Sequence, residues 1–252
     1  MTILRSVSDG IGRLVLDHPP LNILTRAELT ALRHELDALA ADPTLRVLVL
    51  SARGKHFSAG ADVGEHMPPW HLTLIPDFLA TVEQLEAFPL PVIAAVRGRC
   101  LGGGFELIQP ADIIVAGEGA SFGQPEIVLG LFPPAAVVLL PGRVPAGVAA
   151  QLLYSGDPIS AAAAERCGLV TRLAPDDAVE QVADELARRI ARHSAAALRA
   201  AKRAVRGPGE EARRAALLRA GHAYLHDLME TRDAVEGLRA FVEKRQPAWS
   251  NM

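Results

Sequence analysis

Apolar and polar residues follow patterns along the first two-thirds of the chain that predict strands and helices in alternation. After about Leu173 the pattern is helical only. The order predicts an α/β core with a helical C-terminal part. The predicted strands are IGRLVLD (11–17), RVLVLS (46–51), PVIAAV (91–96) and DIIVAG (112–117).

The predicted helices carry recognisable start and stop signals. The segment 25–43 begins at a capping Thr25 and is stopped by Pro43, and its leucines recur on one face. The segment 71–89 also predicts a helix, with a break near Pro76.

Later in the chain, Ser160 is expected to cap a helix that ends at Gly168. From Asp176 onward the pattern predicts helix to the end of the chain. The only interruption it predicts is RGPGEE (206–211).

Composition narrows the class of protein. The chain has 252 residues, of which 50% are apolar, which suits one large domain or one domain with a smaller appendage. A net charge of −3 gives the whole molecule no strong attraction for nucleic acid or anionic membranes. Two cysteines provide no disulfide framework, and neither a signal peptide nor a membrane span is apparent. We therefore expect a cytoplasmic protein.

Two clusters of small residues, GKHFSAGAD (54–62) and LGGGFE (101–106), follow predicted strands. Neither has the spacing of a dinucleotide fingerprint or a P-loop. Glycines between a strand and a helix leave the first helical N–H groups free, where the helix dipole favours negative charge. Either turn alone is also compatible with tight packing. Together, one N–H from each turn could hold a carbonyl oxygen as an oxyanion hole does.

Two glutamates stand beside these turns. Glu106 opens the helix that follows the glycines, and Glu126 lies in SFGQPEIVLG (121–130). Most glutamates are solvated surface residues, but these two lie among apolar residues and glycines. Two carboxyl groups facing one pocket could serve as general base and general acid.

These features together resemble the crotonase family, the enoyl-CoA hydratase and isomerase superfamily. The resemblance covers nearly the whole chain and implies a spiral of ββα turns that binds acyl-CoA thioesters. It implies a core over 1–190 and a helical trimerisation region over 191–252, giving a homotrimer or a dimer of trimers. The matching segments are HPPLNIL with Asn22, RVLVLSARGKHFSAGAD, PLPVIAAVRGRCLGGGFELIQPADIIVA, ASFGQPEIVLG, SGDPISAAAAERCGLV and AFVEKRQPAW.

The resemblance also implies roles for the candidate residues. The oxyanion donors would be the N–H groups of Ala61 and Gly103. Glu106 would activate water for attack at the β-carbon, and Glu126 would exchange the proton at the α-carbon. The presence of both glutamates favours a hydro-lyase of the hydratase type, with an isomerase as the alternative. It also argues against a third alternative, a non-catalytic member of the family. No cofactor is implied beyond the coenzyme A of the substrate.

Two parts of the chain are expected to contact coenzyme A. By resemblance, the backbone of the first turn lies along the adenine, and two C-terminal side chains reach coenzyme A, often from a neighbouring subunit. Lys55 and Arg53 could face phosphates, with simple solvated charge as an equal alternative. The expected contacts are Ser58, Ala59 and Ala61 in the turn and Phe241 and Lys244 near the C-terminus.

The chain departs from the family pattern in two places. Gly64 stands where relatives often have a basic residue, and FPPAAVV (132–138) replaces a glycine-rich segment at the acyl end. Both features resemble the cyclohexa-1,5-diene-1-carbonyl-CoA hydratase branch. Because prolines stiffen a wall, we expect a compact acyl group.

Two other kinds of site were weighed. His56, His66 and His71 lack recognisable metal-ligand spacing, so we expect no metal and regard them as loop histidines near the pocket. The arginine-rich stretch 187–220 is the basis of an alternative, RNA-binding function. A solvated helix face is favoured there, because acids balance the charge and no aromatic residues are interleaved for base stacking.

Overall fold

The structure, a computed structural model that describes residues 3–251, is built on two sheets. The strands are β1 (Ile3–Ser8), β2 (Ile11–Leu16), β3 (Val47–Ala52), β4 (Val92–Val96), β5 (Arg99–Leu101), β6 (Ile113–Gly117), β7 (Ser121–Gly123), β8 (Ile159–Ser160) and β9 (Arg172–Ala174). The large sheet has the order β1-β2-β3-β4-β6-β9, and it is parallel except for the β1–β2 hairpin. The small sheet has the order β5-β7-β8.

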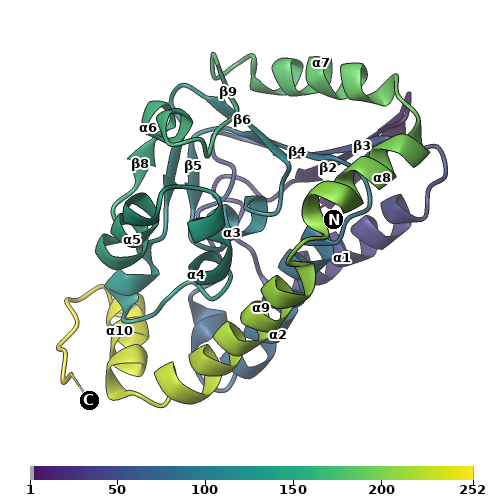
Figure 1. Cartoon of the computed structure of the whole chain (residues 1–252). Helices are drawn as coiled ribbons and strands as arrows, with labels where there is room; N and C mark the ends of the chain where they lie inside the picture. The colour runs from purple at the N-terminus through teal and green to yellow at the C-terminus, as the bar shows by residue number, and fades with distance from the viewer. Residues whose placement is uncertain (1–2, 252) are drawn as a thin grey trace.

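Helices cover both faces of the large sheet (Figure 1). They are α1 (Arg26–Ala40), α2 (His71–Glu86), α3 (Gly103–Ile108), α4 (Ala136–Leu139), α5 (Ala146–Ser155), α6 (Ala161–Arg166), α7 (Val179–Ala191), α8 (Ala195–Arg206), α9 (Glu210–Ala223) and α10 (Arg232–Val242). The predicted α/β core with a helical C-terminal region is confirmed.

Burial of β3 on both faces explains its uninterrupted apolar run. Val47 and Val49 belong to the cluster that packs under α7, whereas Leu48 and Leu50 belong to the main core with the leucines of α1. By contrast, the sequence pattern does not predict β1, because most of this edge strand is exposed.

Local signals at helix ends agree with the structure, with two corrections. Thr25 forms a capping box with Glu28, and Ser160 caps α6. The predicted break near Pro76 is wrong: α2 is continuous, because its buried apolar face holds it to the core while Pro76 lies on the exposed face. The tail is also less continuous than predicted, since Ser194 and Thr231 begin new helices and the chain is irregular beyond α10.

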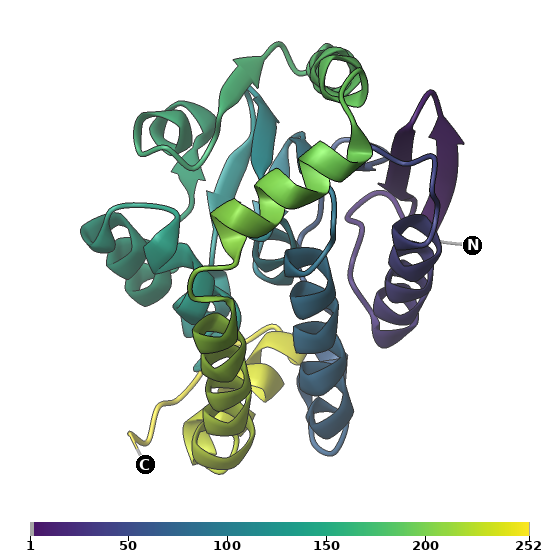
Figure 2. The same ribbon diagram turned by 45° about the vertical axis from the view of Figure 1, so that its right-hand side comes forward.

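The C-terminal helices are attached to the core rather than separate from it. The helix α9 packs beside α2 (Figure 2) and also contacts α4. The boundary predicted at residue 190 falls at the end of α7, and the division into 1–190 and 191–252 stays a prediction.

Asp112 holds α8 against the core through ion pairs with two residues of that helix. One of its carboxylate oxygens accepts the Val92 N–H and pairs with Lys202 Nζ, both at 2.8 Å, and the other pairs with Arg206 at 2.7 Å. Lys202 is only 9% exposed and also donates to the Leu90 carbonyl at 2.8 Å. Burial lowers the pKa of Lys202, and Asp112 opposes that shift.

We predict that Asp112→Ala lowers the free energy of unfolding by about 3–5 kcal/mol, because it leaves the buried Lys202 ammonium without its counter-ion. Urea denaturation measures the change. The exposed Asp157→Ala is a control, expected within about 0.5 kcal/mol of the wild type. A loss below about 1 kcal/mol for Asp112→Ala would show that Asp112 does not hold α8 in place.

Candidate active site

The two glycine-rich turns lie against each other. The Ser58 N–H donates to the Arg99 carbonyl at 3.1 Å, and the Leu101 N–H donates to the Ser58 carbonyl at 3.0 Å. A Cβ placed on Gly103 would lie 3.3 Å from the Ala61 nitrogen. Gly103 is the first residue of α3, so its N–H has no acceptor within the helix. The backbone nitrogens of Ala61 and Gly103 therefore lie near each other, and their role as oxyanion donors stays a prediction.

Buried polar groups fix the first turn. The Asn22 side chain donates to the carbonyls of Arg53 and His56, at 2.9 and 2.8 Å. The Ser58 hydroxyl donates to the Asn22 carbonyl at 2.8 Å and accepts the Gly60 N–H at 3.1 Å. Ser58 shapes the turn because its N–H, carbonyl and hydroxyl each have an internal partner. It is fully buried and does not line the cavity described below, and its contact with coenzyme A stays a prediction.

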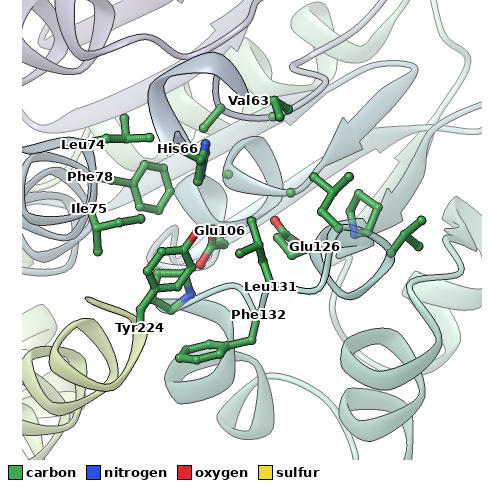
Figure 3. Close-up of a pocket in the computed structure, with 18 of the residues that line it drawn as sticks. Val63, His66, Leu74, Ile75, Phe78, Glu106, Glu126, Leu131, Phe132 and Tyr224 are labelled. Carbon is green, nitrogen blue, oxygen red and sulfur yellow. The ribbon is translucent and has the colours of Figure 1, made fainter. Parts of the chain in front are cut away.

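A cavity of ≈ 240 Å³ opens beside the turns (Figure 3). Ala59, Gly60 and Ala61 line it on one side, together with Gly102 and Gly103. Both glutamates that the sequence singles out also line it. Its apolar wall includes Val63, Leu74, Ile75, Phe78, Leu131 and Phe132.

Glu106 reaches the cavity from α3 and is 3% exposed. Its Oε1 accepts two backbone N–H groups, from Ala135 at 2.7 Å and from Ala136 at 3.0 Å. Burial raises the pKa of Glu106 to about 7, and the two N–H bonds oppose that rise by stabilising the carboxylate. The FPPAAVV segment thus holds Glu106 through its backbone.

Glu126 reaches the cavity from a 3₁₀ turn over Pro125–Leu129. Its Oε1 lies 2.8 Å from where a Cβ would sit on Gly102, whose φ of +52° also favours glycine. Burial, and then the charge of Glu106, raise the pKa of Glu126 well above its usual range. Burial and the charge of Glu106 therefore favour the protonated form of Glu126, and Glu106 is the easier of the two to ionise.

The residues expected to contact coenzyme A are dispersed. Phe241 lines the cavity and is 55% exposed, and Lys244 is exposed just beyond α10. Lys55 lies in a second cleft with His56, which shares no residue with the cavity. Arg53 pairs with Asp17 at 3.0 Å, outside both clefts.

Two polar residues of the cavity carry no predicted role. His66 lines it from a 3₁₀ turn over Gly64–His66, and its Nδ1 lies 2.8 Å from the Asp62 carbonyl. Because a carbonyl only accepts, Nδ1 carries the proton, and burial lowers the pKa of this imidazole. Tyr224 enters from a π-helical turn over Tyr224–Leu228, far along the chain. Nothing in the helical pattern of the tail distinguishes Tyr224 from a core residue.

Residues 3–251 form neither a metal-binding cluster nor a membrane-spanning helix. No three histidine, cysteine, aspartate or glutamate side chains in this part of the chain come together as a metal site would require. None of the helices described above is both long and apolar enough to cross a membrane.

The arginines of 187–220 are partly committed to ion pairs. Arg213 pairs with Glu86 and Arg214 with Glu83, both on α2. These pairs fasten α9 to the core and reduce the charge available to a nucleic acid.

Comparison with known proteins connects this site to a family. The family model for enoyl-CoA hydratase/isomerase matches residues 6–252. A cyclohexa-1,5-dienecarbonyl-CoA hydratase of Thauera aromatica is 42% identical over 241 residues, covering 95% of this chain and 92% of the relative. A 2,3-dehydroadipyl-CoA hydratase of Escherichia coli K12 is 39% identical over 244 residues, covering 93% and 92%.

Solved structures agree. An enoyl-CoA hydratase/isomerase from Pseudoalteromonas atlantica T6c superimposes with a TM-score of 0.92 at 28% identity, over 99% of this chain and 100% of that one. The hydratase names of the relatives confirm the predicted enzyme class, a hydro-lyase of the enoyl-CoA hydratase type. The chain therefore belongs to the enoyl-CoA hydratase/isomerase family, the crotonase family that its sequence resembles.

Proposed function

We propose that this enzyme adds water across the double bond of a 2-enoyl-CoA or cyclic dienoyl-CoA thioester. The observation that carries the proposal is one cavity in which two adjacent backbone N–H groups meet two buried carboxyl groups. Each part answers one need of the reaction, because hydration of a conjugated thioester requires a polarised carbonyl, an activated water and a proton donor.

The N–H groups of Ala61 and Gly103 are the proposed oxyanion hole. They would hold the thioester carbonyl while negative charge develops on its oxygen. Fixed donors in a site that excludes water stabilise such charge without reorganisation. The dipole at the N-terminus of α3 acts in the same direction.

The two carboxyl groups divide the proton transfers. Glu106, as the carboxylate, takes a proton from water while the water oxygen bonds to the β-carbon. Glu126, as the acid, gives its proton to the α-carbon. Transfer of a proton from Glu106 to Glu126 then restores both groups. The pKa order supports this assignment, since Glu126 is held protonated by burial and by the charge of Glu106.

A compact acyl group fits the cavity best. Phe132 and Pro134 of the FPPAAVV segment line the cavity, and the aromatic ring of Phe78 narrows it further. A cyclic acyl group has few rotatable bonds, so it loses little conformational entropy when it binds against a rigid wall. The relative named for a cyclic dienecarbonyl-CoA is consistent with this choice. The relative named for 2,3-dehydroadipyl-CoA, which carries a linear acyl group, supports only the broader 2-enoyl-CoA class.

A substrate panel tests the proposed function. We expect cyclohexa-1,5-diene-1-carbonyl-CoA or crotonyl-CoA to be hydrated with a higher kcat/KM than a long-chain enoyl-CoA. Pro134→Gly should narrow that gap by about 1–3 kcal/mol for each misfitted methylene-sized group. Best turnover of the long-chain thioester would refute the compact pocket, and hydration of none would refute the function.

Replacement of either carboxyl group should abolish most of the activity. Glu106→Gln and Glu126→Gln should each lower the hydration rate by roughly 10²–10⁴-fold, the usual contribution of a positioned acid or base. The base must be ionised, so wild-type kcat/KM should rise as pH increases through about 7, the pKa of Glu106. Stopped-assay rates across pH measure both effects, with circular dichroism as the folding control. Near-wild-type turnover in either variant removes that residue from the mechanism.

We infer that the chain assembles as a homotrimer or a dimer of trimers. Large apolar side chains are exposed near the C-terminus: Phe241 is 55%, Val242 58% and Trp249 42% exposed. Their burial between subunits would remove apolar surface from water. Light scattering at low protein concentration should give the mass of three or six chains. A stable, active monomer would contradict the assembly and would leave Lys244 without a neighbouring subunit's coenzyme A to contact.

A further inference from the structure

The hydroxyl of Tyr224 lacks a hydrogen-bond partner. The side chain is 1% exposed, and no other group within residues 3–251 bonds its oxygen. A buried hydroxyl left in this state destabilises the fold, because it loses its bonds to water and gains none in return. Such a group in a functional protein calls for an occupant that completes it, either water or ligand.

The ring of Tyr224 is fixed, so its hydroxyl points in a defined direction. The ring packs edge-on against Phe132, with centroids 5.5 Å apart at an interplanar angle of 71°. The imidazole of His66 lies on another side, with centroids 6.5 Å apart. In Figure 3 the hydroxyl end of Tyr224 is directed toward Glu106.

The surroundings make this hydroxyl a permanent donor. Burial raises the pKa of Tyr224 above its ordinary value, and the charges of Glu126 and Glu106 raise it further. The phenol therefore keeps its proton throughout the reaction and cannot serve as a base. It faces the same cavity as the carboxylate that is proposed to activate water.

We propose that Tyr224 is a further catalytic residue, which donates a hydrogen bond to the oxygen that is added to the substrate. That oxygen belongs first to the water held by Glu106 and then to the β-hydroxyl group of the product. This assignment rests on the proposed hydration and gives the entering oxygen a second contact, in addition to Glu106.

The bond requires no net proton transfer by tyrosine. Glu106 takes one proton from the water, and the water oxygen bonds to the β-carbon. The Tyr224 hydroxyl keeps its own proton and donates its hydrogen bond to that water oxygen throughout. In the reverse direction, the C–O bond breaks and negative charge gathers on the departing oxygen. A donor fixed at that point stabilises this charge, and the forward reaction passes through the same transition state.

The test begins with Tyr224→Phe, which removes the hydroxyl and keeps the ring. We expect kcat/KM for hydration to fall about 10- to 100-fold, the size of one hydrogen bond to a partly charged oxygen. The free energy of unfolding should be unchanged or higher, because the lost hydroxyl has no protein partner. Tyr154→Phe is the matched control: Tyr154 is 76% exposed, and both quantities should stay at wild-type values.

Product inhibition distinguishes a hydrogen bond from Tyr224 to the added oxygen from mere packing of the Tyr224 ring against the ligand. The inhibitors are the β-hydroxyacyl-CoA and the saturated acyl-CoA that share the carbon skeleton of the best panel substrate. Tyr224→Phe should weaken binding of the hydroxy compound by the same 10- to 100-fold and leave the saturated one unchanged. Equal weakening of both, or of neither, overturns the proposal.

The glutamate variants and the substrate panel distinguish a failure of the tyrosine assignment from a failure of the proposed hydratase function. If Glu106→Gln and Glu126→Gln lose hydration while Tyr224→Phe retains it, the tyrosine assignment alone is wrong. If the glutamate variants retain hydration, the roles proposed for the glutamates are wrong. If the wild-type protein hydrates no thioester of the panel, the proposed function itself is wrong. Reduced stability of Tyr224→Phe together with reduced activity would show that the hydroxyl has a structural partner, and would also overturn the assignment.

Discussion

The burial of two carboxyl groups in one cavity is the constraint on which the rest of this structure depends. Neither Glu106 nor Glu126 has a cation beside it among the groups described, so burial raises the pKa of both. An uncompensated buried carboxylate is expensive, and the chain reduces that cost with backbone dipoles. The amides of Ala135 and Ala136 converge on one oxygen of Glu106. That arrangement leaves Glu106 close to ionisation at neutral pH without neutralising it by a salt bridge.

This constraint explains why the FPPAAVV segment has two functions. Its side chains at Phe132 and Pro134 form part of the cavity wall, and its next two residues supply the donors to Glu106. A change in the shape of the wall therefore also moves the donors that lower the pKa of Glu106 against the effect of burial. Acyl selection and acid–base chemistry are coupled through a few consecutive residues.

The turns beside the carboxyl groups obtain their rigidity from the sheets. Bonds between Ser58 and β5 align the two segments, and Asn22 fixes the start of the first turn. Backbone donors held in this way need no rearrangement when charge develops on a ligand. The C-terminal helices close the cavity from the other side, where Tyr224 and Phe241 enter it.

The sequence by itself determined the features that depend on local chemistry. The apolar runs at 46–51 and 91–96, the Thr25 cap and the glycine turns each predict their structure, because periodicity, capping and backbone freedom act over a few residues. The local sequence pattern also placed Glu106 one turn into a helix that begins at glycine. The same kind of pattern wrongly predicted a break at Pro76, where burial of the rest of α2 outweighs the local penalty of proline.

Only the tertiary structure decided which distant residues share the cavity. Tyr224 lies in a helical tail whose pattern is that of ordinary core packing. Of the three histidines expected near the pocket, His66 lines the cavity and His56 and His71 do not. The amides that hold Glu106 cannot be recognised from sequence, because every residue except proline has an N–H and only the fold aims it. Lys55, adjacent in sequence to the first turn, lies instead in a separate cleft. Side-chain direction and long-range packing are collective properties, so a local pattern cannot specify them.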